Sequence, residues 1–132
     1  MDYRVIIPNT INPLPNEHEI SAAHILARHY KTIVEFIAPI QSYKQKTPDI
    51  IMNGLLWEIK SPNGSSKKTT VEKQLRTALK QSNNVIFDSR HTKLTQGVII
   101  RQLLENAKLH KKTSKIILIS KDEKVIEVYN KR

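Results

Sequence analysis

The dipeptide Asn53-Gly54 constrains the fold of this chain more than any other feature of its sequence. Runs rich in apolar and β-branched residues flank it on both sides. An Asn-Gly pair between two such runs predicts a two-residue type I′ turn, because both turn positions require a positive φ. We therefore expect an antiparallel β-hairpin over residues 49–60, in which Asp49 lies directly opposite Glu58.

Apolar patterns predict the other elements of the chain. The 3.6-residue spacing of apolar positions indicates helices over 16–30, 69–82 and 95–111. Short β-branched runs indicate strands over 3–7, 32–37, 49–52, 55–60, 85–88, 115–120 and 125–129. Prolines and polar residues indicate loops over 8–15, 38–47 and 61–68. This order predicts one domain over residues 1–132, an α/β sandwich around a mixed β-sheet, with the strand at 85–88 parallel to a hairpin strand.

Charge and composition limit the partners of the chain. The net charge is +10, and residues 1–60 hold six Lys/Arg against six Asp/Glu, so the whole excess lies in the second half. Such a balance favours nucleic acid or another polyanion, although lysines that merely solubilise helix surfaces are the alternative. The chain has no cysteine, so any metal must be bound by oxygen or histidine ligands. No apolar run approaches the ~20 residues of a membrane span, and no secretory signal is visible.

Three charged residues of the hairpin are expected to share one face. Alternation places Glu58 and Lys60 on the same side of the second strand, and Asp49 lies across from Glu58. Like charges directly opposite each other are destabilising unless something compensates them, and a divalent cation would do so. Two carboxylates suit Mg²⁺ or Mn²⁺, beside which Lys60 can assist attack on a phosphodiester. The alternative is a solvated pair of Glu58 and Lys60, with Asp49 as a turn residue.

A third acidic ligand is expected from the first helix. Glu19 leads the apolar side of this helix, whereas Glu17 leads its polar side, so we favour Glu19 and keep Glu17 as the alternative. A purely structural role for Glu19 is also open. With Asn16 as the N-cap, Glu19 would be the N3 member of a capping box.

The motif Pro48-Asp49, followed by Glu58-Ile59-Lys60 and preceded by a helix bearing Glu19, resembles the PD-(D/E)XK nuclease superfamily. The stretch that includes Trp57 to Pro62 and Gln81-Ser82 looks like the C-terminal tRNase domains of contact-dependent growth inhibition toxins. The resemblance covers roughly residues 17–90. It implies a restriction-endonuclease-like three-layer sandwich and a metal-dependent endonuclease, with Glu19, Asp49 and Glu58 as metal ligands.

The resemblance favours tRNA as substrate, with DNA cleavage by the same centre as the alternative. A non-catalytic nucleic-acid-binding domain is the rival of another class. An acidic immunity protein is an expected partner, and the cytoplasm is the expected site of action. Basic residues after the hairpin are candidates for phosphate contacts, with Gln81 a candidate by resemblance. The full set of candidate nucleic-acid contacts is Lys67, Lys68, Lys73, Arg76, Lys80, Gln81 and Arg90.

Overall fold

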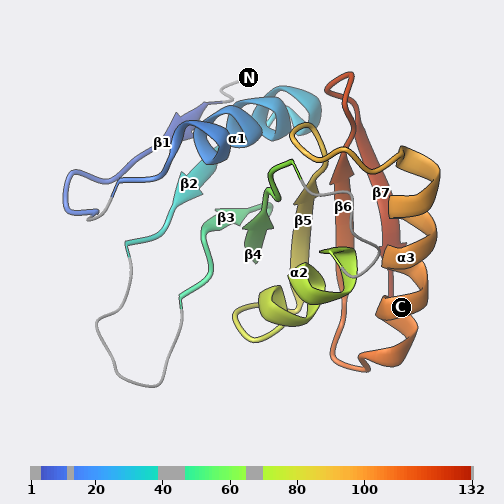
Figure 1. Ribbon diagram of the computed structural model, residues 1–132. Coiled ribbons are helices and arrows are strands. Elements are labelled where there is room, and N and C mark those ends of the chain that lie inside the picture. Colours follow the sequence, from blue (N-terminus) through green and yellow to red (C-terminus); the bar gives the residue numbers. More distant parts are fainter. Residues whose placement is uncertain (1–3, 12–13, 39–46, 65–69, 132) are drawn as a thin grey trace.

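Strands that follow one another in the chain lie side by side in a single mixed sheet (Figure 1). The computed structural model describes residues 4–11, 14–38, 47–64 and 70–131. Within them seven strands are formed: β1 (Val5–Ile6), β2 (Val34–Phe36), β3 (Ile50–Met52), β4 (Leu55–Lys60), β5 (Asn84–Asp88), β6 (Lys115–Ile119) and β7 (Val125–Asn130). The helices in the same ranges are α1 (Glu17–Tyr30), α2 (Thr70–Ala78) and α3 (Gln96–Leu109).

The direction of each strand follows from its connection. β1 and β2 are parallel across α1, and β4, β5 and β6 are parallel across α2 and α3. β2, β3 and β4 run antiparallel, as do β6 and β7. Parallel neighbours need a long crossover, which the helices provide, whereas the hairpin needs two residues. The expected parallel pairing of the strand at residue 85 with the hairpin is therefore confirmed.

The register of the hairpin is the expected one. Ile50 pairs with Trp57, and Met52 pairs with Leu55. Asn53 and Gly54 have φ of 52° and 76°, the positive values that a type I′ turn requires. The turn therefore determines which residues of β3 and β4 lie opposite each other.

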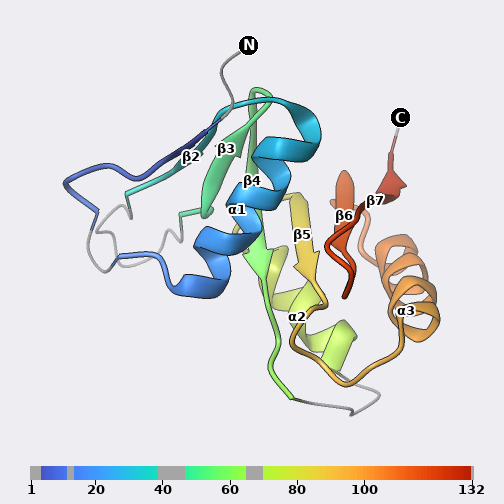
Figure 2. The ribbon, with the colours of Figure 1, turned by 90° about the horizontal axis from the view of Figure 1, so that it is seen from above.

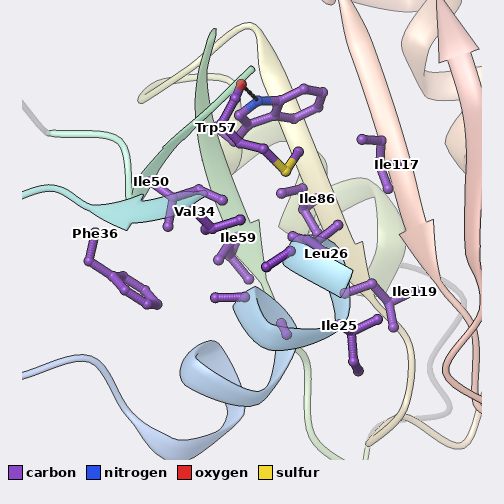
Figure 3. Close-up of a cluster of buried hydrophobic side chains, with 14 of the residues drawn as sticks. Ile25, Leu26, Val34, Phe36, Ile50, Trp57, Ile59, Ile86, Ile117 and Ile119 are labelled. Carbon is purple, nitrogen blue, oxygen red and sulfur yellow. Dashed lines mark hydrogen bonds between the residues drawn. The ribbon is translucent and has the colours of Figure 1, made fainter. Parts of the chain in front are cut away.

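Helices cover both faces of the sheet. One apolar cluster joins α1 to residues such as Trp57, Ile59 and Ile86 (Figure 3). The other joins α2 and α3 to residues such as Val85 and Phe87. Because side chains alternate along a strand, successive residues of β5 enter different clusters. Figure 2 shows α1 well separated from α2 and α3, with strands of the sheet between them.

Some elements are shorter than their sequence patterns suggested. The second helix was expected to reach residue 82, but it ends at Ala78. Lys80 and Gln81 then donate backbone hydrogen bonds to carbonyls three residues earlier, Thr77 (3.2 Å) and Ala78 (2.9 Å). Such bonds tighten the chain into turns at a helix end. The expected strands at 3–7 and 32–37 are likewise reduced to β1 and β2, and the expected loop at 38–47 lies almost wholly outside the described residues.

None of the helices in the described part of the chain has the length and apolar character of a membrane span. The longest, α1 and α3, have 14 residues each, and both have polar exposed sides. A bilayer requires about 20 predominantly apolar residues in a helix.

Candidate active site

The hairpin brings two carboxyl groups into contact. The backbone amide of Asp49, just before β3, donates to the carbonyl of Trp57 at 3.0 Å, one position out of the register that pairs Trp57 with Ile50. Asp49 Oδ2 in turn accepts a hydrogen bond from the amide of Ile59 at 2.8 Å. The charge of its carboxyl group acts on that of Glu58 and contributes to the raised pKa of Glu58. Asp49 thus lies near Glu58, as the turn predicted, but it precedes the first residue of β3 and is not part of the paired register, which ends at Ile50 and Trp57.

This carboxyl pair is held in an unfavourable electrostatic environment. Glu58 is only 4% exposed, and burial together with the charge of Asp49 raises its pKa to about 8. Burial also raises the pKa of Asp49, against the hydrogen bond from Ile59. The ammonium group of Lys60 lies 3.5 Å from Glu58 Oε2 and offsets part of the cost. A buried carboxyl pair with a raised pKa and a nearby cation is typical of a site with a chemical task.

The donor set fits a hard divalent cation. Glu58 Oε1 is buried and has no hydrogen-bond partner among the described residues, and leaving such an atom unpaired is costly. A cation between Asp49 and Glu58 would bind that oxygen and remove the repulsion between the two carboxylates. In the ranges that the structure describes, no group of three acidic, histidine or cysteine side chains is close enough to hold a metal ion together. The pair therefore fits Mg²⁺ or Mn²⁺, which take much of their coordination shell from water and substrate.

Glu19 caps α1 and faces the carboxyl pair as well. Its amide donates to Asn16 Oδ1 at 2.8 Å, and its Oε1 accepts from the amide of Asn16 at 3.0 Å, so the capping box is present. Burial and the charge of Asp49 raise the pKa of Glu19, while Lys60 lowers it. Glu19 and Asp49 both line one hollow of about 180 Å³. Glu17, the alternative, is exposed on the same helix.

The basic candidates on α2 lie at the surface. Lys73, Arg76 and Lys80 are exposed, and Arg76 makes an ion pair with Glu72 at 3.7 Å, which is also exposed. Gln81 is half-buried in the turn that follows the helix. Lys67 and Lys68 lie outside the described residues. The exposed cations carry a surface charge that a phosphate backbone can reach.

Arg90 has a different position from the other basic candidates. Its side chain is only 9% exposed. Its Nε and Nη2 donate to the two carboxylate oxygens of Asp88, at 2.9 and 2.8 Å. Its Nη1 donates to Ser21 Oγ at 2.8 Å, and Nη2 lies 3.5 Å from the carbonyl of His18. The guanidinium group therefore connects the end of β5 to the first turns of α1, instead of pointing to solvent.

Sequence patterns did not reveal the partners of Arg90. Asp88 has no exposed surface and also accepts from Ser61 Oγ at 3.3 Å, just beyond Lys60 at the end of β4. One signal in the sequence was available: Asp88 follows the apolar run Val85-Ile86-Phe87 and stands two residues before Arg90. Next to this pair, the rings of His18 and His91 lie 3.8 Å apart, a contact between segments distant in sequence that no local pattern predicts.

Comparisons with known proteins point to one family. The sequence model of the family described as "Contact-dependent growth inhibition CdiA C-terminal domain" matches residues 46–125, which include the whole hairpin. A solved structure from Burkholderia pseudomallei, described as "CdiA-CT/CdiI toxin and immunity complex", is similar in fold. The TM-score is 0.62 at 20% identity over 91% of this chain and 93% of that one. Among curated proteins, none matches the sequence.

Proposed function

Since the chain belongs to the family of CdiA C-terminal toxin domains, we propose that its toxic activity is metal-dependent cleavage of nucleic acid. The observation that carries the proposal is the contact between Asp49 and Glu58, with an unpartnered buried oxygen and Lys60 at 3.5 Å. An arrangement that serves only folding would pair that oxygen. We propose further that the chain is a member of the PD-(D/E)XK superfamily with a restriction-endonuclease-like fold.

Each residue of the site has a distinct task in this proposal. Asp49 and Glu58 would bind Mg²⁺ or Mn²⁺. Glu19, expected as a third ligand, lines the same hollow as Asp49, but among the described residues it does not form a three-ligand group with the pair. When bound, the cation supplies charge stabilisation at the phosphate and lowers the pKa of water. Asp49 is kept in orientation by the amide of Ile59. Lys60, 19% exposed and 3.5 Å from Glu58 Oε2, would contact a phosphate oxygen and stabilise the charge that develops on it.

The basic surface would hold the substrate. Lys73, Arg76 and Lys80 lie on or just after α2, the helix that follows the hairpin, and Gln81 follows them. Phosphate contacts position nucleic acid without reading its sequence. Lys67 and Lys68, in the segment that connects the hairpin to α2, belong to the same proposal. Arg90, by contrast, would act on the position of α1 through Ser21 and not on the substrate directly.

We propose tRNA as the first substrate to test and DNA as the alternative for the same centre. The solved structure similar in fold comes from a toxin and immunity complex. For this chain we therefore propose an immunity partner, acidic because the chain carries a net charge of +10. We propose the cytoplasm of a target cell as the place of action, where tRNA and chromosomal DNA are both accessible.

A cleavage assay with total tRNA and with plasmid DNA tests the proposal, in Mg²⁺, in Mn²⁺ and with chelator. The wild type is compared with Glu58→Ala and with Glu105→Ala, which removes an exposed carboxylate on α3. We expect cleavage of one substrate that chelator and Glu58→Ala both abolish and that Glu105→Ala retains. If neither substrate is cut while salt-sensitive binding persists, the chain is a non-catalytic nucleic-acid-binding domain.

A further inference from the structure

A groove of about 550 Å³ lies at the turn end of the hairpin, bordered by Gly54, Leu55 and Leu56. It lies between the beginning of β4, the turns after α2 and the segment that precedes β6. Among the described residues that line it are Lys80 and Lys112, and no carboxylate. Both lysines are exposed. The groove is therefore suited to an anionic ligand.

The groove adjoins the carboxyl pair. Leu56, on its wall, points to the same face of β4 as Glu58, because the two residues are two positions apart. This spacing along a strand corresponds to about 7 Å. Pro48, also on the wall, immediately precedes Asp49. A nucleic-acid strand bound at the carboxyl pair can therefore extend into the groove, because the separation is about the length of one nucleotide.

Two amide side chains in the groove are free to bind a ligand. In the part of the chain that the structure describes, the side chains of Gln81 and Asn83 make no hydrogen bonds. Each offers a carbonyl acceptor and two N–H donors, the groups that pair with the edges of bases. Leu56 is 46% exposed beside them and provides an apolar surface.

Hydrogen bonds join the turn after α2 to β4 at the floor of the groove. Ser82 Oγ donates to the carbonyl of Leu56 at 2.8 Å, and Asn84 Nδ2 donates to the same carbonyl at 3.1 Å. The amide of Asn84 donates to Ser82 Oγ at 3.1 Å. These bonds attach the turn after α2, which carries Gln81 and Asn83, to the strand that carries Glu58.

We propose that this groove binds an unpaired nucleotide next to the bond that is cut, so that the preferred substrate is a single-stranded or looped segment of RNA. The proposal rests on the proposed function. In a duplex the base edges that pair with each other are occupied and stacked, whereas an unpaired base can present its edge to Gln81 and Asn83. Lys80 and Lys112 would contact the adjoining phosphates.

Binding in the presence of chelator tests this proposal without requiring cleavage. A fluorescent RNA oligonucleotide is titrated with the full chain, once as a single strand and once annealed to its complement. We expect tighter binding of the single strand. The double variant Gln81→Ala/Asn83→Ala should lose about tenfold in affinity for the single strand, as expected for two hydrogen bonds, and keep its affinity for the duplex.

Lys112→Ala provides a second variant that cannot disturb the core, because this side chain is exposed. Its matched control is Lys121→Ala, which removes the same charge from the turn between β6 and β7. Lys112→Ala should weaken single-strand binding several-fold more than the control does. Equal affinity for single strand and duplex, or an amide variant that binds like the wild type, would overturn the proposal. Intact single-strand preference without any cleavage would support the groove and contradict the proposed nuclease.

Discussion

Glu58 and Asp88 are buried carboxylates on the neighbouring parallel strands β4 and β5, with 4% and 0% of their surface exposed. Asp88 is fully compensated. Arg90 donates to both of its oxygens, and Ser61 adds a third side-chain donor. Glu58 instead faces the carboxyl group of Asp49 and a lysine at 3.5 Å.

The two buried carboxylates differ in how far neighbouring donors and cations compensate for the cost of burying their charge. The bidentate ion pair raises the pKa of Arg90, so this arginine stays charged at any physiological pH. Burial and the charge of Asp49 raise the pKa of Glu58 to about 8, and within the described ranges its Oε1 has no hydrogen-bond partner. One strand therefore carries a carboxylate that stabilises the fold, and the next carries one that destabilises it. Such a local cost is retained where the group has a task beyond folding.

Breaking the compensated pair should have the largest effect. Arg90→Met leaves the carboxylate of Asp88 buried without its counter-charge, so we expect the free energy of unfolding to fall by about 3–5 kcal/mol. Urea denaturation followed by circular dichroism measures this loss. The matched control is Arg101→Met, whose ion pair with Glu105 is exposed, with atoms 4.0 Å apart. It should change stability by no more than about 0.5 kcal/mol. Equal effects of the two substitutions would contradict the assigned role of Arg90.

The uncompensated carboxyl group should make stability depend on pH in the opposite sense to an ordinary salt-bridged acid. The pKa of Glu58 is 4.5 when unfolded and about 8 when folded. Between these values the folded chain holds a proton that the unfolded chain has lost. The free energy of unfolding of the metal-free protein should therefore fall as pH rises from about 5 to 8, by up to about 1.4 kcal/mol per pH unit.

Glu58→Gln tests this pH dependence directly. The amide does not titrate, so in chelator the variant should be more stable than the wild type at pH 8 and lose most of the slope. Denaturation midpoints at several pH values, for both proteins, provide the measurement. A wild-type slope that persists in the variant would assign the pH dependence to another group.

A divalent cation should offset the cost of having the buried Glu58 ionised beside Asp49. At pH 8, Mn²⁺ or Mg²⁺ at ten times its dissociation constant should stabilise the wild type by about 1.4 kcal/mol. Glu58→Gln should show little of this gain, since one of the two carboxylates in contact is gone. Thermal melts with and without the metal measure the difference. Similar stabilisation of both proteins would place the cation elsewhere.

The smallest effect on stability is expected at the surface of α2. Arg76→Ala removes an exposed ion pair with Glu72 and should cost about 0.5 kcal/mol or less. It should still weaken nucleic-acid binding at low salt and reduce the slope of log affinity against log salt by about one. Lys121→Ala is the control of equal charge. An unchanged slope would remove Arg76 from the binding surface.

Much of the fold could be predicted because it depends on local patterns. The turn at Asn53-Gly54 set the register of β3 and β4, and alternation then gave the faces of their side chains. The helix that begins after Asn16 was indicated by its capping residues and apolar stripe. Less certain were the ends of elements, such as α2 at Ala78, where the pattern of apolar residues continues after the helix has ended.

The candidate site also contains residues that a local pattern could predict and residues that depend on tertiary contacts. Asp49, Glu58 and Lys60 could be placed together because 12 consecutive residues around one turn contain them all. The sequence left the choice between Glu17 and Glu19 open, since it depends on how α1 lies against the sheet. Likewise, the sequence pattern predicted a surface position for Arg90, and only the structure shows its contacts with Ser21 and Asp88.

The sequence by itself thus determined the pairing of the hairpin, the order of the elements and the basic charge of the second half. Only the tertiary structure decided that Arg90 contacts α1 and that Gln81 and Asn83 border a groove with Lys112. It also decided that Glu58 Oε1 is buried with no partner in the described part of the chain. The physical reason is the separation along the chain over which each kind of interaction acts. Turn preference and side-chain alternation act between neighbours in the chain, whereas burial and charge pairing depend on segments that only folding brings together.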